Sequence, residues 1–209
     1  IFSRARDLNI RVDTVERERI NSMVHGVHQG VVAEVRNFDF IELSTLIQQA
    51  KGSGRHALFV VLDGIQDPHN FGAIVRTAWA FGAHGVIIGK DRSAPVTAVV
   101  AKASAGAIEH CPIARVVNVS RALEELKAAG VWTVAAVLDG DRTLWAAPLT
   151  GPIALVVGAE GDGVREGVKK HCDFQVKIPM SAGFDSLNAS VSAGVMLAEI
   201  ARQRAAVSK

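Results

Sequence analysis

From residue 57 onward, short apolar runs alternate with segments of helical periodicity, and this alternation constrains the fold more than any other feature. Most of the runs are apolar at nearly every position, which is typical of strands buried on both faces of a sheet. Strands separated by helices favour parallel pairing, because parallel neighbours need a crossover connection. The sequence therefore predicts an α/β fold with a mainly parallel sheet flanked by helices. The predicted strands cover residues 57–62, 86–88, 113–117, 131–138, 153–157 and 174–178.

The helices are predicted from the residues at their ends. A helix over residues 71–81 is closed by Gly82, since glycine accepts the left-handed backbone that often ends a helix. A second helix, over residues 121–129, is expected to begin at a capping Ser120 and to stop at Gly130.

The last helix follows Asn188 and is apolar nearly all round, with Ser190, Ser192 and Glu199 as its polar side chains before residue 202. A helix of that kind is buried on more than one side. We therefore expect it to pack on its own sheet and against a second subunit.

The chain divides into three parts. Residues 1–36 mix arginines with acids, and a strand-like run over residues 29–35 is expected to close a small unit. Residues 37–56 are assigned as a linker that contains a short helical pattern over residues 41–50 and ends in Lys-Gly-Ser-Gly-Arg. The main domain then covers residues 57–209.

Composition adds limited information. A formal net charge of +2 over 209 residues neither requires nor excludes an RNA partner, because binding needs a local basic patch. Cys111 and Cys172 belong to no C-x-x-C pattern, and no apolar run has transmembrane length, so we expect a soluble, cytoplasmic protein with reduced thiols. The chain starts at Ile1 and its first methionine is Met23, so we expect it to be part of a longer protein.

Three loops each follow a strand and precede a helix, where open α/β sheets bind ligands. The first contains Asn70, which can cap a helix, and leads to Arg76 within an otherwise apolar helix. Such an arginine needs an anionic partner, which is either a structural salt bridge or a bound phosphate. The second, residues 158–164, holds Glu160 among glycines that permit close approach of a ligand.

The third loop begins at Pro179, which ends the last strand because proline has no N–H for the ladder. Ser186 and Asn188 stand where the last helix begins, and at such positions side-chain oxygens usually cap free N–H groups. The small residues of the loop also suit a ligand that contacts the backbone, so both interpretations stay open.

Common cofactor motifs are absent. Gly161-Asp162-Gly163 is followed by Glu166 where a dinucleotide fingerprint requires glycine, and Gly89-Lys90-Asp91 lacks the serine or threonine of a P-loop. His25 and His28 have no neighbouring cysteine or third ligand, so a solvated turn is preferred to a metal site.

Taken together, the three loops resemble the three motifs of the SpoU (TrmH-like) family of RNA 2′-O-ribose methyltransferases, in the SPOUT superfamily. The resemblance covers residues 57–205. Residues 27–33 and 63–70 are most similar to the branch that methylates a guanosine in large-subunit (23S) ribosomal RNA. The matching residues are Asn70 with Arg76, Gly158 with Glu160 and Gly163, and Ile178-Pro179-Met180 with Ser186-Leu187-Asn188.

The resemblance implies a deep trefoil knot at the carboxyl end, a homodimer, S-adenosylmethionine as cofactor and RNA as substrate. Residues 1–36 would be the remnant of a small α/β substrate-binding domain. The residues implied to bind the cofactor are Gly158, Gly161, Ile178, Met180 and Leu187, and those implied at the target nucleotide are Asn70, Arg76, Glu160, Ser186 and Asn188. No metal is implied.

Arg76 has a counterpart in the family that is proposed as the general base. A guanidinium is effectively never neutral in a protein, so we favour a role in which Arg76 anchors a phosphate and lowers the pKa of the ribose hydroxyl. Three alternatives stay open: a tRNA methyltransferase of the same family, an RNA-binding protein without catalysis and a nucleotide-binding oxidoreductase. The failed fingerprint disfavours the last of these.

Overall fold

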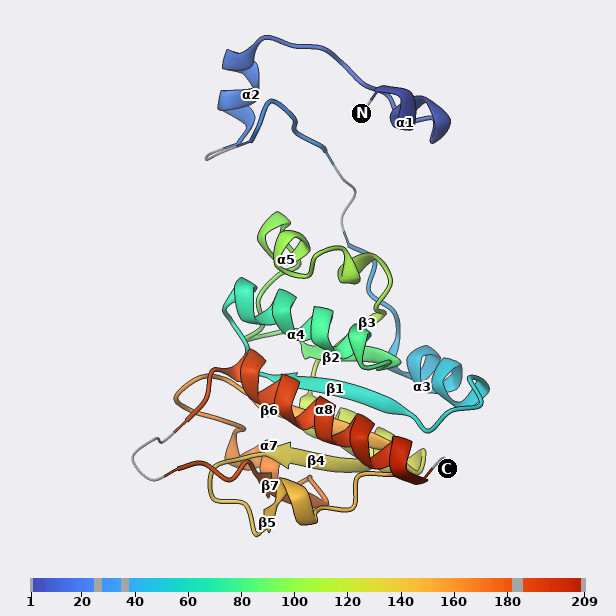
Figure 1. Ribbon diagram of the computed structural model, residues 1–209, viewed down its shortest axis with the longest axis vertical. Coiled ribbons are helices and arrows are strands. Elements are labelled where there is room, and N and C mark those ends of the chain that lie inside the picture. Colours follow the sequence, from blue (N-terminus) through green and yellow to red (C-terminus); the bar gives the residue numbers. More distant parts are fainter. Residues whose placement is uncertain (1, 25–27, 35–37, 182–185, 208–209) are drawn as a thin grey trace. The chain divides into compact units, whose positions relative to one another are not determined.

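The structure is a computed structural model that describes residues 2–24, 28–34, 38–181 and 186–207 (Figure 1). The chain forms two compact units, Ile1–Phe38 and Asp39–Lys209.

In the first unit, the described residues form helices α1 (Phe2–Asp7) and α2 (Arg17–Met23) and no strand. The predicted strand over residues 29–35 is therefore wrong for residues 29–34. Gln29 and Gly30 have φ values of 50° and 79°, and this left-handed backbone makes a turn where a strand needs extended residues.

The described residues of the second unit form a seven-stranded sheet in the order β3-β2-β1-β6-β4-β7-β5, and every pair of neighbours is parallel. The predicted α/β fold with a mainly parallel sheet flanked by helices is confirmed. Six strands match predicted runs; β5 was not predicted, because two residues carry no periodicity. The strands are β1 (Leu58–Asp63), β2 (Gly85–Gly89), β3 (Ile113–Val116), β4 (Trp132–Ala136), β5 (Arg142–Thr143), β6 (Ile153–Gly158) and β7 (Phe174–Lys177).

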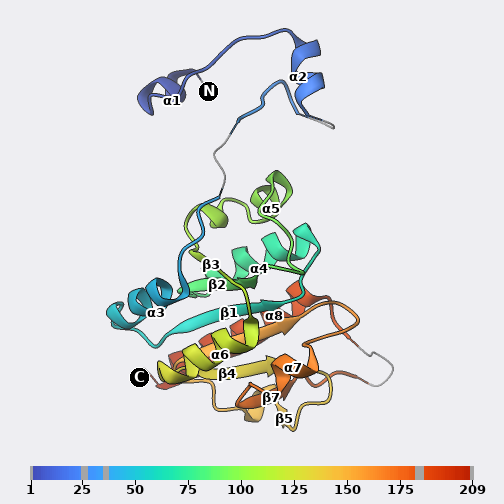
Figure 2. The same cartoon turned by 180° about the vertical axis from the view of Figure 1, so that it is seen from behind.

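Helices cover both faces of the sheet. Helices α4 and α8 lie over one face (Figure 1), and α3 and α6 lie over the other (Figure 2). None of the described helices is long and apolar enough to cross a membrane. The helices of this unit are α3 (Leu43–Gly52), α4 (Pro68–Ala80), α5 (Ala98–Ala103), α6 (Val119–Ala128), α7 (Glu166–Lys169) and α8 (Ala189–Val207), with 3₁₀ turns η1 (Ala107–Glu109) and η2 (Leu144–Ala146).

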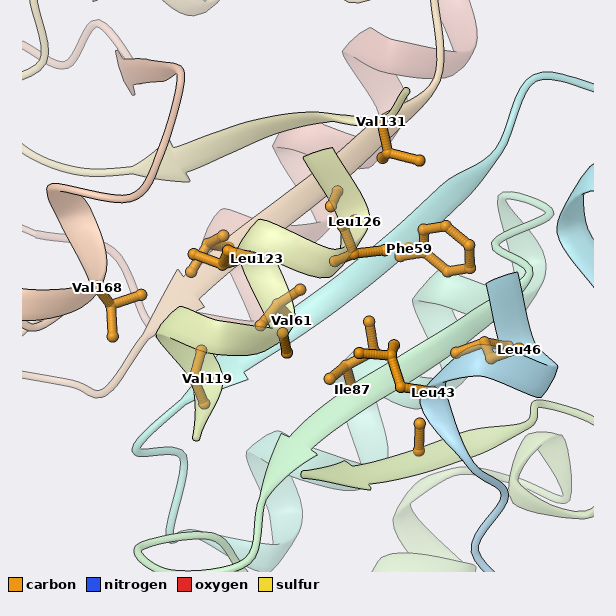
Figure 3. Close-up of a cluster of buried hydrophobic side chains, with 14 of the residues drawn as sticks. Leu43, Leu46, Phe59, Val61, Ile87, Val119, Leu123, Leu126, Val131 and Val168 are labelled. Carbon is orange, nitrogen blue, oxygen red and sulfur yellow. The ribbon is translucent and has the colours of Figure 1, made fainter. Parts of the chain in front are cut away.

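Helix α3 corrects the linker assignment. Leu46 and Ala50 are almost completely buried, and they join a core cluster with Phe59 of β1 and Leu126 of α6 (Figure 3). Residues 43–52 are therefore part of the main domain, and the prediction of a linker over residues 37–56 is wrong for them. The pattern over residues 41–50 predicts a helix but does not show that its apolar side meets the core.

Two helix caps also differ from expectation. The Asp67 side chain accepts hydrogen bonds from the backbone N–H groups of His69 and Asn70, so Asp67 caps α4 and Asn70 lies within its first turn. Asn118 caps α6 through Arg121 N–H, whereas the predicted cap, Ser120, lies inside the helix and donates to the Gly167 carbonyl. Each helix starts earlier than predicted, and the cap moves with it.

Gly72 allows α4 and α5 to approach closely. A Cβ at Gly72 would stand 2.6 Å from Ala103 Cβ and 2.7 Å from the Val100 carbonyl oxygen. We expect Gly72→Ala to lower the free energy of unfolding by about 1–3 kcal/mol, because the two helices must separate. Urea unfolding measures the change.

The matched control is Gly167→Ala in α7, where an added Cβ meets nothing within 4 Å. There we expect no loss, and a gain of up to about 1 kcal/mol from helix propensity. Equal effects of the two substitutions would contradict the argument from close packing.

Candidate functional site

A cavity of about 180 Å³ lies at the carboxyl ends of β6, β4 and β7. Parallel pairing places these ends at one edge of the sheet, where loops with ligand-binding residues gather. All five residues predicted to bind a cofactor line this cavity, together with Glu160 and Ser186. The five are Gly158, Gly161, Ile178, Met180 and Leu187.

The segment that follows β4 was missed as part of the site. Val137, Leu138 and Asp139 line the cavity beside the loop after β6. The sequence did contain a signal, because residues 137 and 138 end a run predicted as a strand of the same sheet, and Asp139 follows it directly. Asp162 and Lys169 add charged side chains to a mostly apolar lining.

The loop after β6 folds back onto its own first residue. Gly161 and Gly163 have φ values of 85° and 64°, and Gly163 N–H donates to the Ala159 carbonyl at 2.9 Å. A Cβ at Gly158 would lie 2.0 Å from the Gly163 carbonyl carbon. Only glycine fits at position 158, because the returning backbone occupies the space of a side chain.

Three polar side chains from distant parts of the chain meet beside the cavity. Glu160 Oε1 accepts hydrogen bonds from Asn70 Nδ2 at 3.0 Å and from Asn188 Nδ2. Asn188 Nδ2 also donates to Asn70 Oδ1 at 2.9 Å. The backbone N–H of Ala189 lies 3.4 Å from the same Glu160 oxygen. The first, second and third loops are therefore joined through one carboxylate.

The two ends of the Asn188 amide make different contacts. Its oxygen Oδ1 accepts from the backbone N–H groups of Ser190 at 2.9 Å and Val191 at 3.3 Å, and so caps α8. Its nitrogen Nδ2 binds Glu160 and Asn70. An amide can do both, because it carries an acceptor and a donor at opposite ends. Within the same loop, residues 182–185 lie outside the described residues.

Arg76 is not brought to the cavity. It lies on α4 with an exposed side chain, and among the described residues it forms no ion pair and does not line the cavity. The predicted need for an anionic partner assumed a buried arginine; an exposed guanidinium is solvated by water. The salt-bridge interpretation therefore finds no partner in the described part of the chain.

Of the two histidines weighed for a metal site, the structure describes His28 alone. His25 lies outside the described residues. The ring of His28 contacts Asn21 Oδ1 at 2.8 Å through Nε2 and accepts from Gly30 N–H at 3.0 Å through Nδ1. Both ring nitrogens of His28 thus take part in local hydrogen bonds.

Comparison with known proteins gives two family matches. The SpoU rRNA Methylase family matches residues 57–198, and a family described as RNA 2′-O ribose methyltransferase substrate binding matches residues 1–40.

Two similar proteins are named 23S rRNA (guanosine-2′-O-)-methyltransferase RlmB. The one from Pseudomonas putida is 42% identical over 98% of this chain and 82% of its own length. The one from Coxiella burnetii is 40% identical over 99% of this chain and 82% of its own length.

Among solved structures, the SpoU methyltransferase AviRb from Streptomyces viridochromogenes, in complex with the cofactor AdoMet, is similar. It has a TM-score of 0.67 and 33% identity. The alignment covers 72% of this chain and 59% of AviRb.

The hydrogen bond from Asn188 to Glu160 has a measurable consequence. We expect Asn188→Ala to lower the free energy of unfolding by about 1 kcal/mol for the lost cap. A further loss of roughly 0.5–1.5 kcal/mol is expected because Glu160 loses a donor. Urea unfolding of the variant and of the unaltered chain measures the difference in free energy.

The control is Asn118→Ala, which removes a cap of the same residue type from α6, where the side chain accepts from Arg121 N–H. Asn118→Ala should lower the free energy of unfolding only by the contribution of the cap. A smaller cost for Asn188→Ala than for Asn118→Ala would show that the Glu160 contact contributes no stability.

Proposed function

The chain belongs to the SpoU rRNA methylase family, and from this we propose that it transfers a methyl group from S-adenosylmethionine to a ribose 2′-hydroxyl of RNA. One observation carries the proposal. The residues Asn70, Glu160 and Asn188, one from each family motif, are hydrogen-bonded together beside a cavity that the second and third motifs line.

The cavity suits this cofactor. Its lining combines apolar side chains with backbone at Gly158 and Gly161, which suits an adenine and a thioether chain. Asp139 and Asp162 provide carboxylates at the lining, and a carboxylate favours a cationic ligand. When bound, S-adenosylmethionine supplies an electrophilic methyl group on a sulfonium. We propose that Gly158, Ile178 and Leu187 hold it by backbone groups, with Gly161 and Met180 beside it.

For the substrate, we propose a guanosine of 23S ribosomal RNA. The support is the similarity to the two RlmB proteins, which extends over 98% or more of this chain. A tRNA ribose is the alternative within the family. We further propose that residues 1–36 contribute RNA binding, which the match of residues 1–40 to a substrate-binding family supports. Ribosomal RNA as substrate also favours the cytoplasm as the place of action.

The polar network is proposed to hold the target ribose. Glu160 ties the start of α4 to the start of α8, and this fixes the loops on both sides of the reacting groups. A fixed arrangement of the two reactants can contribute about 7–11 kcal/mol at best to lowering the barrier. Ser186, at the cavity lining, is proposed to position the nucleotide.

Arg76 is proposed to bind the phosphate next to the target ribose. Its positive charge favours the ionised hydroxyl and so lowers that pKa, while the proton passes to a phosphate oxygen or to water. The exposed side chain on α4 leaves the guanidinium available to RNA.

We propose that the enzyme acts as a homodimer. Val191 and Ala198 are exposed on α8 and Val195 is half-buried, which leaves an apolar stripe on a helix that otherwise packs in the core. A second copy of the chain would cover this stripe. We also propose that the segment after β7 forms the trefoil knot, and the lining of one cavity by both Leu187 and Gly158 supports it.

The proposed reaction is tested with S-adenosylmethionine and 23S ribosomal RNA that lacks modifications. After incubation, alkaline hydrolysis is read at nucleotide resolution, because a 2′-O-methyl group blocks cleavage at its own phosphodiester. We expect one protected guanosine. Protection of a tRNA instead would favour the alternative substrate, and absence of both protection and cofactor binding would refute the methyltransferase proposal.

The proposed role of Arg76 requires a planar guanidinium, which can donate two hydrogen bonds to one phosphate. We expect Arg76→Lys to reduce turnover at saturating RNA and cofactor by roughly 10- to 100-fold, because lysine cannot bind a phosphate bidentately. Arg121→Lys, which changes an exposed side chain on α6, is the control and should leave turnover unchanged. Near-full turnover of Arg76→Lys would rule out a need for the guanidinium.

A further inference from the structure

An ion pair between a buried aspartate and a partly exposed arginine lies next to the cavity without lining it. Asp63, the last residue of β1, has a side chain with no exposed surface. Its Oδ1 accepts from Arg165 Nε at 2.8 Å and from Nη2 at 2.5 Å, and its Oδ2 accepts from Arg165 backbone N–H at 2.9 Å. Neither residue belongs to the cavity lining.

Asp63 holds both ends of the loop after β6. In the sheet, the backbone of Asp63 is paired with Gly158, the last residue of β6, from which that loop starts. The side chain of Asp63 binds Arg165, which directly follows the last residue of the loop, Val164. Every residue between these two points, from Gly158 to Val164, lines the cavity. One residue thus sets the distance between the ends of the loop.

The loop needs a contact that holds its two ends together. It contains Gly158, Gly161 and Gly163, and glycine loses more conformational freedom on ordering than any other residue. A buried carboxylate is stable only when it is paired, so Asp63 strongly favours the conformation in which Arg165 reaches it. The hydrogen bond with Asp63 also raises the pKa of Arg165 above its usual value, so the guanidinium stays charged.

We propose that Asp63 and Arg165 form a positioning pair that keeps the loop after β6 in its cofactor-binding shape and thereby sets the affinity for S-adenosylmethionine. The proposal rests on the proposed function, since it assigns the loop to this cofactor. Glu160 lies in the same loop, so the pair also positions the carboxylate that joins Asn70 and Asn188.

The test measures the Kd of S-adenosylmethionine by calorimetry on the full chain, together with thermal unfolding. Asp63→Asn keeps the shape of the side chain and removes its charge. We expect the Kd to rise roughly tenfold, a factor that corresponds to about 1.4 kcal/mol. Arg165→Lys should raise the Kd less than Arg165→Met does, because lysine keeps the positive charge although it cannot make the paired hydrogen bonds of a guanidinium.

The matched control is Glu199→Gln. Glu199 is also a buried carboxylate held by an arginine, with Arg202 Nε at 2.7 Å and Nη2 at 2.8 Å, but it does not line the cavity. We expect it to lower the melting temperature as Asp63→Asn does and to leave the Kd unchanged.

The results distinguish failure of the proposed function from failure of the proposed positioning pair. If the unaltered chain does not bind S-adenosylmethionine, the proposed function itself fails. If it binds and both Asp63→Asn and Arg165→Met bind equally well, the positioning pair is refuted. If Glu199→Gln weakens binding as much as Asp63→Asn does, the effect is general destabilisation, which also refutes it. Should Asp63→Asn fail to fold, the comparison of Arg165→Lys with Arg165→Met decides the question.

Discussion

Parallel pairing of the strands is the constraint on which the rest of the structure depends. Because β1, β6, β4 and β7 all run in one direction, the loops that follow them emerge at one edge of the sheet. Residues more than a hundred positions apart thereby become neighbours. An antiparallel arrangement of the same segments would send alternate loops to opposite edges, and no common cavity would form.

At that edge, a single carboxylate gathers the three loops. Glu160 accepts hydrogen bonds from two asparagine amides, and each amide stands at the start of a helix that packs on the same face of the sheet. A charged acceptor makes stronger hydrogen bonds than a neutral one, so the contact fixes helix starts as well as loops. A second carboxylate, Asp63, belongs to the same edge and binds the far end of the Glu160 loop. The site is thus supported by charges that are satisfied within the protein.

The strands and most helices could be predicted because burial and periodicity are local properties of the sequence. The predictions that are wrong depend on the three-dimensional structure, such as the choice between two neighbouring residues for one helix cap. Ser120 and Asn118 both suit a helix cap, and only the observed helix start shows that Asn118 performs this role. The linker assignment failed for α3 because a short helix with few apolar residues gives no sign of whether they meet a core.

By itself, the sequence determined which segments are buried, which loops carry polar residues among glycines, and which family motifs are present. Tertiary structure decided which of these residues meet. Asn70, Glu160 and Asn188 touch because strand register and helix packing bring them together, and neither is encoded within any one segment. Arg76 lies outside the cavity because the rotation of α4 is set by its packing against α5 and α8, a long-range property that no local pattern contains.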